Sequence, residues 1–139
     1  MDINDTLDYI FRVEREFEDW DRKYKESKDH RWFLSYVFMS ERIKTLVKDN
    51  LNSISVYLDE LKSKLGEFFE SKDLPFHIDT AVKYIDEIKS ELRNIVHMYN
   101  EQQDYTKIRN EWGIVLLKIL KLTRDLRGRL LIIKRIIEK

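Results

Sequence analysis

The chain has almost none of the residues that make tight turns or sulfur chemistry. In 139 residues it has no cysteine, one proline and three glycines. Without cysteine there can be no disulfide, no thiol nucleophile and no thiolate-bound metal, as expected of a protein kept in a reducing compartment. The few prolines and glycines leave little room for tight turns, so we expect long, uninterrupted elements.

Targeting and membrane signals are also missing. The opening MDINDTLDYIF is acidic, whereas a secretory signal begins with basic residues. No apolar run approaches the roughly 18 residues that a membrane-spanning helix needs. These features predict a soluble, cytoplasmic protein with no membrane partner.

What the chain does contain is typical of amphipathic helices. Apolar residues make up 42% of the sequence and charged residues 37%, which suits helices that bury one face and expose the other. A length of 139 residues predicts a single domain over residues 1–139. Alanine occurs once, so the helices must depend on packing more than on intrinsic propensity. The abundance of charged residues also follows a trend of thermophile proteomes and is compatible with a thermophilic or viral source.

Apolar residues recur at steps of three or four in four stretches. The stretches run from about Asp5 to Lys28, from Trp32 to Phe68, from the Ser71–Pro75 boundary to Tyr99, and from about Tyr105 to Ile137. Pro75 is tolerated only in a first helical turn, so it marks a helix start. Polar residues at 48–53 predict either a kink there or one continuous rod. The sequence therefore predicts an all-α, antiparallel up-and-down bundle of about four long helices with coiled-coil-like packing.

The last helix has apolar residues on more than one side. At 100° per residue its main stripe centres on Ile119 and Leu126. The opposite side is basic, yet it also carries four large aliphatic residues: Ile114, Leu117, Ile132 and Ile136. A helix contacted on two sides explains them, whereas one buried stripe does not. Either the other helices wrap this one within a single chain, or it forms a subunit interface.

Charge is divided unevenly along a chain that is neutral overall. Residues 1–29 hold ten acidic and six basic groups, residues 30–105 hold thirteen and ten, and residues 106–139 hold three and ten, so the three segments carry −4, −3 and +7. The chain can neutralise itself by placing its acidic first helix beside its basic last helix, within one protomer or across a dimer.

These patterns predict a non-enzymatic binding protein, such as an adaptor, inhibitor or small subunit. The contacts would be made by the last helix with a protein partner or, as the first expectation, with a second copy in a homodimer. The alternative is a nucleic-acid-binding bundle that uses the basic face of residues 107–139. Its phosphate-binding residues would be Lys118, Lys121, Arg124, Arg127, Arg129, Lys134 and Arg135.

Enzymatic patterns are sparse. Arg93 and His97 lie on one helix face with Glu101, which faintly resembles the Arg-x4-6-His motif of HEPN-type ribonucleases, although the spacing here is Arg-x3-His. Glu67 and Glu70 form the Glu-x-x-Glu pair seen in all-helical nucleotide pyrophosphatases, without a second acidic pair at a useful spacing. The remote alternative is thus a small helical ribonuclease or nucleotide hydrolase. We expect no catalytic residues, metal, cofactor or small-molecule substrate.

Overall fold

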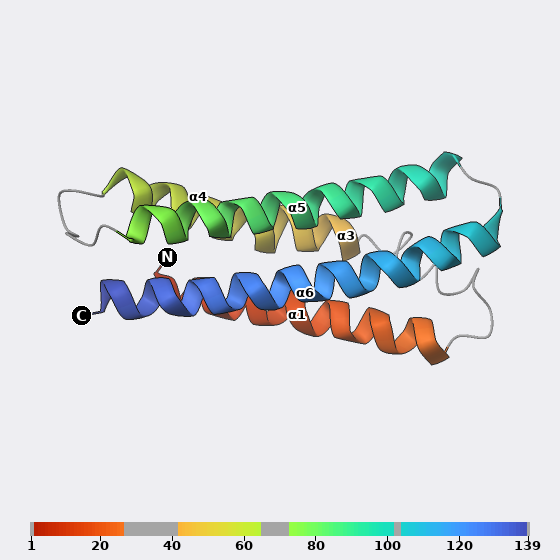
Figure 1. Ribbon diagram of the computed structural model, residues 1–139, viewed down its shortest axis with the longest axis horizontal. Helices are drawn as coiled ribbons and strands as arrows, with labels where there is room; N and C mark the ends of the chain where they lie inside the picture. Colours follow the sequence, from red (N-terminus) through yellow and green to blue (C-terminus); the bar gives the residue numbers. More distant parts are fainter. Residues whose placement is uncertain (1, 27–41, 65–72, 102–103, 139) are drawn as a thin grey trace.

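The described part of the chain is helical except for single residues at the helix ends, and it contains no strand. The structure is a computed structural model that describes residues 2–26, 42–64, 73–101 and 104–138. Its elements are α1 (Ile3–Glu26), α3 (Arg42–Thr45), η1 (Leu46–Leu51), α4 (Asn52–Ser63), α5 (Leu74–Glu101) and α6 (Tyr105–Ile137). Because α3, η1 and α4 follow one another without interruption, these elements form four rods that run alternately in opposite directions (Figure 1). The predicted all-α, antiparallel bundle is confirmed.

Local side-chain bonds explain where two of the rods begin. The Asp5 amide donates to the Asp2 carboxylate (2.9 Å) and the Asp2 amide donates to the Asp5 carboxylate (3.0 Å), so the two residues cap the start of α1 reciprocally. At the start of α6 the Asp104 carboxylate accepts hydrogen bonds from the amides of Thr106 (3.0 Å) and Lys107 (3.4 Å). Pro75 is the second residue of α5, as its tolerance of a first turn predicts.

The polar residues at 48–53 mark a widened turn inside a continuous rod. Leu46–Leu51 is a π-helix, and the Asn52 amide donates to the Val47 carbonyl five residues earlier. The Asn50 side chain is buried there and its Nδ2 donates to the Thr45 carbonyl (3.3 Å). The chain thus neither breaks nor stays a regular α-helix at this point.

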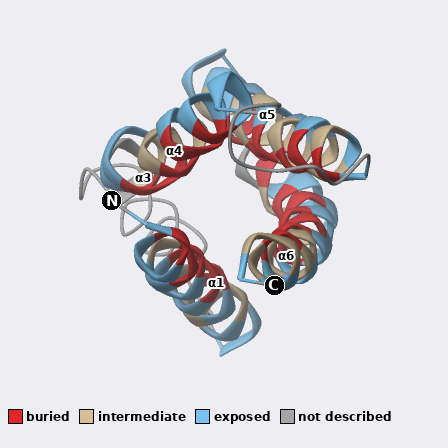
Figure 2. Ribbon diagram, turned by 90° about the vertical axis from the view of Figure 1, so that its left-hand side faces the viewer, coloured by how far each residue is buried: buried red, intermediate tan, exposed pale blue. Residues whose placement is uncertain are grey.

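The four rods surround one apolar core, with the buried faces turned inward (Figure 2). Going around the ring, α1 contacts α4 and η1, α4 contacts α5, α5 contacts α6, and α6 contacts α1 again. The largest fully buried side chains include Trp20 and Trp112, whose rings meet edge to face with centroids 5.9 Å apart. This pair joins α1 to α6 near the start of α6.

Some predicted features lie outside the described residues. They are the end of the first stretch at Lys28, the beginning and end of the second stretch at Trp32 and Phe68, and Ser71.

Candidate protein-interaction surface

Helix α6 forms one wall of the bundle. It packs against α5 on one side and α1 on the other, and its remaining side faces outward (Figures 1 and 2). The core side of the predicted stripe, including Ile119 and Leu126, is fully buried. One of the two predicted arrangements was a last helix wrapped by the others within a single chain. The other described helices do not cover α6 on all sides, so its outward side is the one available for contact.

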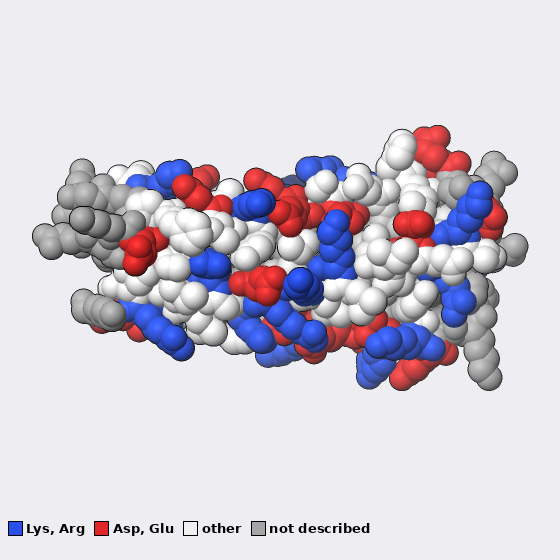
Figure 3. Space-filling view, in the orientation of Figure 1, with Lys and Arg blue, Asp and Glu red and all other residues white. Residues whose placement is uncertain are grey.

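The four aliphatic residues predicted to contact a partner divide into two pairs. Ile114 and Leu117 lie one turn apart and are 63% and 66% exposed. Ile132 and Ile136 are only partly exposed, and Ile136 packs against the core. Leu117 and Ile132, the nearest members of the two pairs, lie about 22 Å apart along the helix at 1.5 Å per residue. Together, Ile114 and Leu117 define an exposed apolar patch. Over this face of the bundle, uncharged surface alternates with the side chains of Lys, Arg, Asp and Glu (Figure 3).

Other exposed apolar rings are partly covered by cations of this chain. The Arg129 guanidinium lies 5.6 Å from the centroid of the Phe76 ring, and that of Arg127 lies 6.0 Å from the centroid of the Phe11 ring. Such contacts reduce the exposure of an aromatic face to water. Nothing comparable covers the patch of Ile114 and Leu117 within the described residues.

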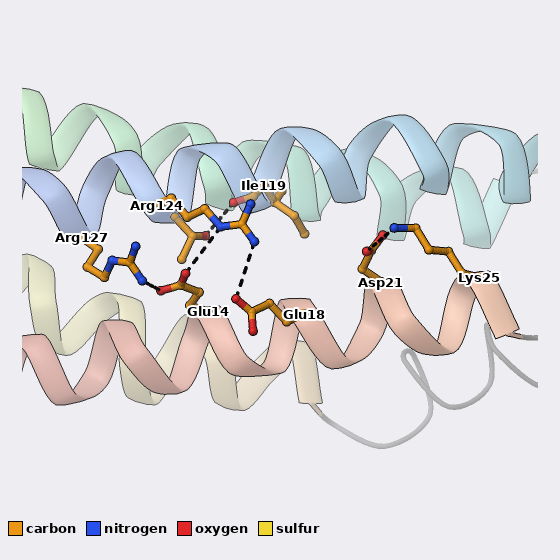
Figure 4. A network of polar contacts seen from close by, with 8 residues as sticks. Glu14, Glu18, Asp21, Lys25, Ile119, Arg124 and Arg127 are labelled. Carbon is orange, nitrogen blue, oxygen red and sulfur yellow. Dashed lines mark hydrogen bonds and ion pairs between the residues drawn. The ribbon is translucent and has the colours of Figure 1, made fainter.

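On the side of α6 that faces α1, the basic residues meet the acidic first helix. Glu14 is buried on α1, and its carboxylate receives Arg127 Nη1 at 2.5 Å and Arg124 Nε at 3.5 Å (Figure 4). Arg124 also reaches Glu18 at 3.6 Å. The acidic and basic ends of the sequence thus neutralise each other within one protomer, which was one of the two predicted arrangements.

The side of α6 that faces α5 repeats this pairing. Lys118 Nζ lies 2.7 Å from the Glu91 carboxylate, and the hydrogen bond with Glu91 raises the pKa of Lys118 above its usual range. Arg129 Nη1 lies 2.7 Å from His77 Nδ1. A guanidinium can only donate, so His77 Nδ1 is the acceptor in this contact.

Most of the seven predicted phosphate-binding residues are therefore engaged within the chain. Lys134 also lies 4.0 Å from Glu138. Lys121 and Arg135 are exposed and have no ion-pair partner in the described part of the chain. Of the seven predicted phosphate-binding residues, only these two are unpaired within the described chain, and they are spaced 14 residues apart. They offer much less positive charge for binding phosphates than the seven residues that the sequence suggested.

Four charged residues beside the patch were missed as a group by the sequence reasoning. Lys107, Glu111, Lys121 and Asp125 are all exposed on α6, and their side chains make no ion pair or hydrogen bond with the residues that the structure describes. At 100° per residue they lie within about 60° of Ile114 around the helix. Their spacing was readable in the sequence, but only the structure separates them from the cations that are paired with α1 and α5.

The residues considered for catalysis do not form an enclosed site. Arg93, His97 and Glu101 are all exposed on α5, and His97 lies in an open depression with Asn94, Met98 and Glu101. Glu67 and Glu70 lie outside the described residues. Among the residues described, no three His, Asp or Glu side chains are grouped to hold a metal ion.

The described helices also lack a membrane segment, since none of them is both long and apolar enough to cross a bilayer. Comparison with protein-family models, curated proteins and solved structures found no match to this chain, so any functional conclusion rests on the residues themselves.

Proposed function

We propose that the protein is a non-enzymatic helical binding module whose contact surface is the outward side of α6 around Ile114 and Leu117. One observation carries the proposal. Two large aliphatic side chains, about two-thirds exposed, lie one turn apart on a helix whose other exposed positions are mostly charged. Single exposed apolar residues are common, but an adjacent pair without a covering side chain favours a contact site.

The burial available at the patch sets the scale of the interaction. Burying a whole Leu or Ile side chain contributes about 1.5–3 kcal/mol. With about two-thirds of each side chain still exposed, covering Leu117 contributes about 1–2 kcal/mol, which is about 5- to 30-fold in affinity. This suits a modest, reversible contact.

The charge distribution favours a protein partner over a nucleic acid. Arg124 and Arg127 are held by Glu14, and Lys118 by Glu91. Binding phosphates would require these ion pairs to be broken and replaced. A protein surface that covers the patch can leave them intact.

Site-specific photocrosslinking in cells that express the full chain tests the proposal. A photoreactive residue at position 114 is expected to give a defined protein adduct, which can be a second copy of the chain, whereas one at position 56 should not. Val56 is the matched control because it is an exposed apolar residue (52%) on α4, across the ring from α6.

Binding of the purified adduct protein then measures the contribution of the patch. Leu117→Gln is expected to weaken binding about 5- to 30-fold, and Val56→Gln to leave it unchanged. Equal adducts from positions 114 and 56, or wild-type affinity for Leu117→Gln, would refute the proposal. A strongly salt-dependent affinity for DNA or RNA that does not respond to Leu117→Gln would favour nucleic-acid binding instead.

A further inference from the structure

The unpaired charges beside the patch follow an order that fits a second copy of the same helix. Along α6 they read Lys107, Glu111, Lys121 and Asp125, with the apolar patch between the two pairs. These charged residues are exposed, have no partner in the described chain and are spaced symmetrically about the apolar patch. This is the pattern expected of a two-fold symmetric, antiparallel pair of identical helices. This inference rests on the function proposed above, because it concerns the same surface.

We infer that the outward side of α6 binds the same side of a second copy, antiparallel, about a two-fold axis at the level of residue 116. Lys107 and Asp125 each lie nine residues from that axis, and Glu111 and Lys121 each lie five residues from it. Lys107 then faces Asp125 of the second copy, and Glu111 faces its Lys121. By symmetry this makes four ion pairs around a centre formed by two copies of Ile114 and Leu117.

The neighbouring registers are disfavoured by like charges. With the axis at residue 114, Lys107 would face Lys121 of the second copy. With the axis at residue 118, Glu111 would face Asp125. A parallel pair in register would place each charge opposite its own equivalent. Because like charges across an interface disfavour a pairing, the four residues select one orientation and one register.

Gly128 fits the same arrangement. It is an exposed glycine in the interior of α6, and a Cβ placed there would meet nothing within 4 Å. Nothing within the described chain therefore requires a glycine at this position. Gly128 and Asp104 each lie twelve residues from residue 116, so Gly128 faces the point where the second copy's α6 begins. The missing side chain allows the two backbones to approach there.

Sedimentation analysis of the full chain from about 5 to 500 µM tests the pairing. The wild type is expected to form dimers in a concentration-dependent way. Lys121→Glu alone and Glu111→Lys alone should each weaken the dimer about tenfold, because each turns two attractive pairs into repulsive ones. The double variant restores opposite charges and should recover to within about threefold of the wild type.

Three further variants distinguish the register from a general effect of charge. Arg135→Glu makes the same change in charge as Lys121→Glu, but at an exposed residue outside the overlap, and should leave the dimer unchanged. The chain has no cysteine of its own, so single cysteines report the geometry cleanly. Leu117→Cys should be joined to its equivalent by a short thiol cross-linker. Arg135→Cys should not, because the two residues would lie about 57 Å apart along the helices.

The outcomes separate this inference from the proposed function. If the folded wild type stays monomeric at 500 µM, the inference that a second copy binds this surface is wrong. The proposed function is then tested only by the protein adduct from position 114. Efficient cross-linking at position 135, or no rescue in the double variant, overturns the antiparallel register. A dimer that is unaffected by Leu117→Gln forms through another surface, which overturns the pairing of two copies at this patch and leaves the proposed function to the position-114 adduct.

Discussion

The variant Glu14→Gln removes the charge of one buried carboxylate. It tests whether ion pairs between the acidic first helix and the basic last helix stabilise the fold. The Glu14 side chain is only 8% exposed and receives two guanidinium groups from α6. Glutamine keeps the shape and one acceptor oxygen but removes the negative charge. Arg127, whose side chain is 34% exposed, is then left beside a neutral amide in a partly buried position.

The magnitude follows from the burial of the three groups. Breaking a buried ion pair by removing one partner costs about 3–5 kcal/mol. Water compensates part of that cost here because Arg124 is 52% exposed and Arg127 is 34% exposed. We therefore expect the free energy of unfolding to fall by about 1.5–2.5 kcal/mol. With an unfolding entropy of about 2.1 cal/mol/K per residue, the corresponding fall in Tm is about 5–9 °C.

Urea unfolding at low protein concentration, followed by circular dichroism, measures the change. A double-mutant cycle with Arg127→Met isolates the pair and should give a coupling of about 1–2 kcal/mol. Asp21→Asn is the control, because Asp21 pairs with Lys25 on the same helix (2.8 Å) and Lys25 is 66% exposed. Its effect should stay below about 0.5 kcal/mol. A Glu14→Gln variant as stable as the Asp21→Asn control would refute the reasoning.

Two further predictions concern single side chains in the monomer. Gly113→Ala should lower Tm, because the new Cβ would lie 2.8 Å from the Tyr24 hydroxyl. That hydroxyl donates to the Arg109 carbonyl at 3.0 Å. Gly128→Ala should add about 0.5–1 kcal/mol of stability, because its Cβ meets open space. Equal shifts for the two variants would contradict this packing. Burial, and after it the Asp2 carboxylate, raises the pKa of Tyr57 above its ordinary value of 10.0, so the folded chain keeps the phenol proton longer and stability falls as pH rises above 10. Tyr57→Phe should show a shallower fall in the urea midpoint from about pH 10 to 11.5, and an unchanged slope would contradict the prediction.

Much of the fold was readable from the sequence. Steps of three and four placed the start of α1 and both ends of α6 within two residues of their observed positions, because an amphipathic stripe is a direct consequence of 3.6 residues per turn. Pro75 marked the start of α5 for a steric reason that needs no tertiary contact. The choice at residues 48–53 was harder, since low helix propensity identifies an irregular position without saying whether the backbone breaks or widens.

The candidate site was only partly readable. The wheel placed Ile114, Leu117, Ile132 and Ile136 on one side of the last helix, but the structure exposes the first two far more than the last two. A helical wheel treats every turn alike, whereas the covering of each turn depends on which neighbouring side chains lie beside it. The same limitation applied to the basic residues, because the sequence alone does not distinguish a Lys or Arg in an ion pair from an unpaired one.

The sequence by itself determined the helices, their polarity along the chain and the opposite charges of its two ends, because these depend on local periodicity and residue type. Only the tertiary structure decided which charged residues of α6 form ion pairs with α1 and α5 and which remain unpaired within the described chain. Arg124 and Arg127 meet Glu14 across more than 100 positions of sequence, while Lys121 on the same helix meets none of the described acids. That distinction depends on distances between helices, which no local pattern encodes.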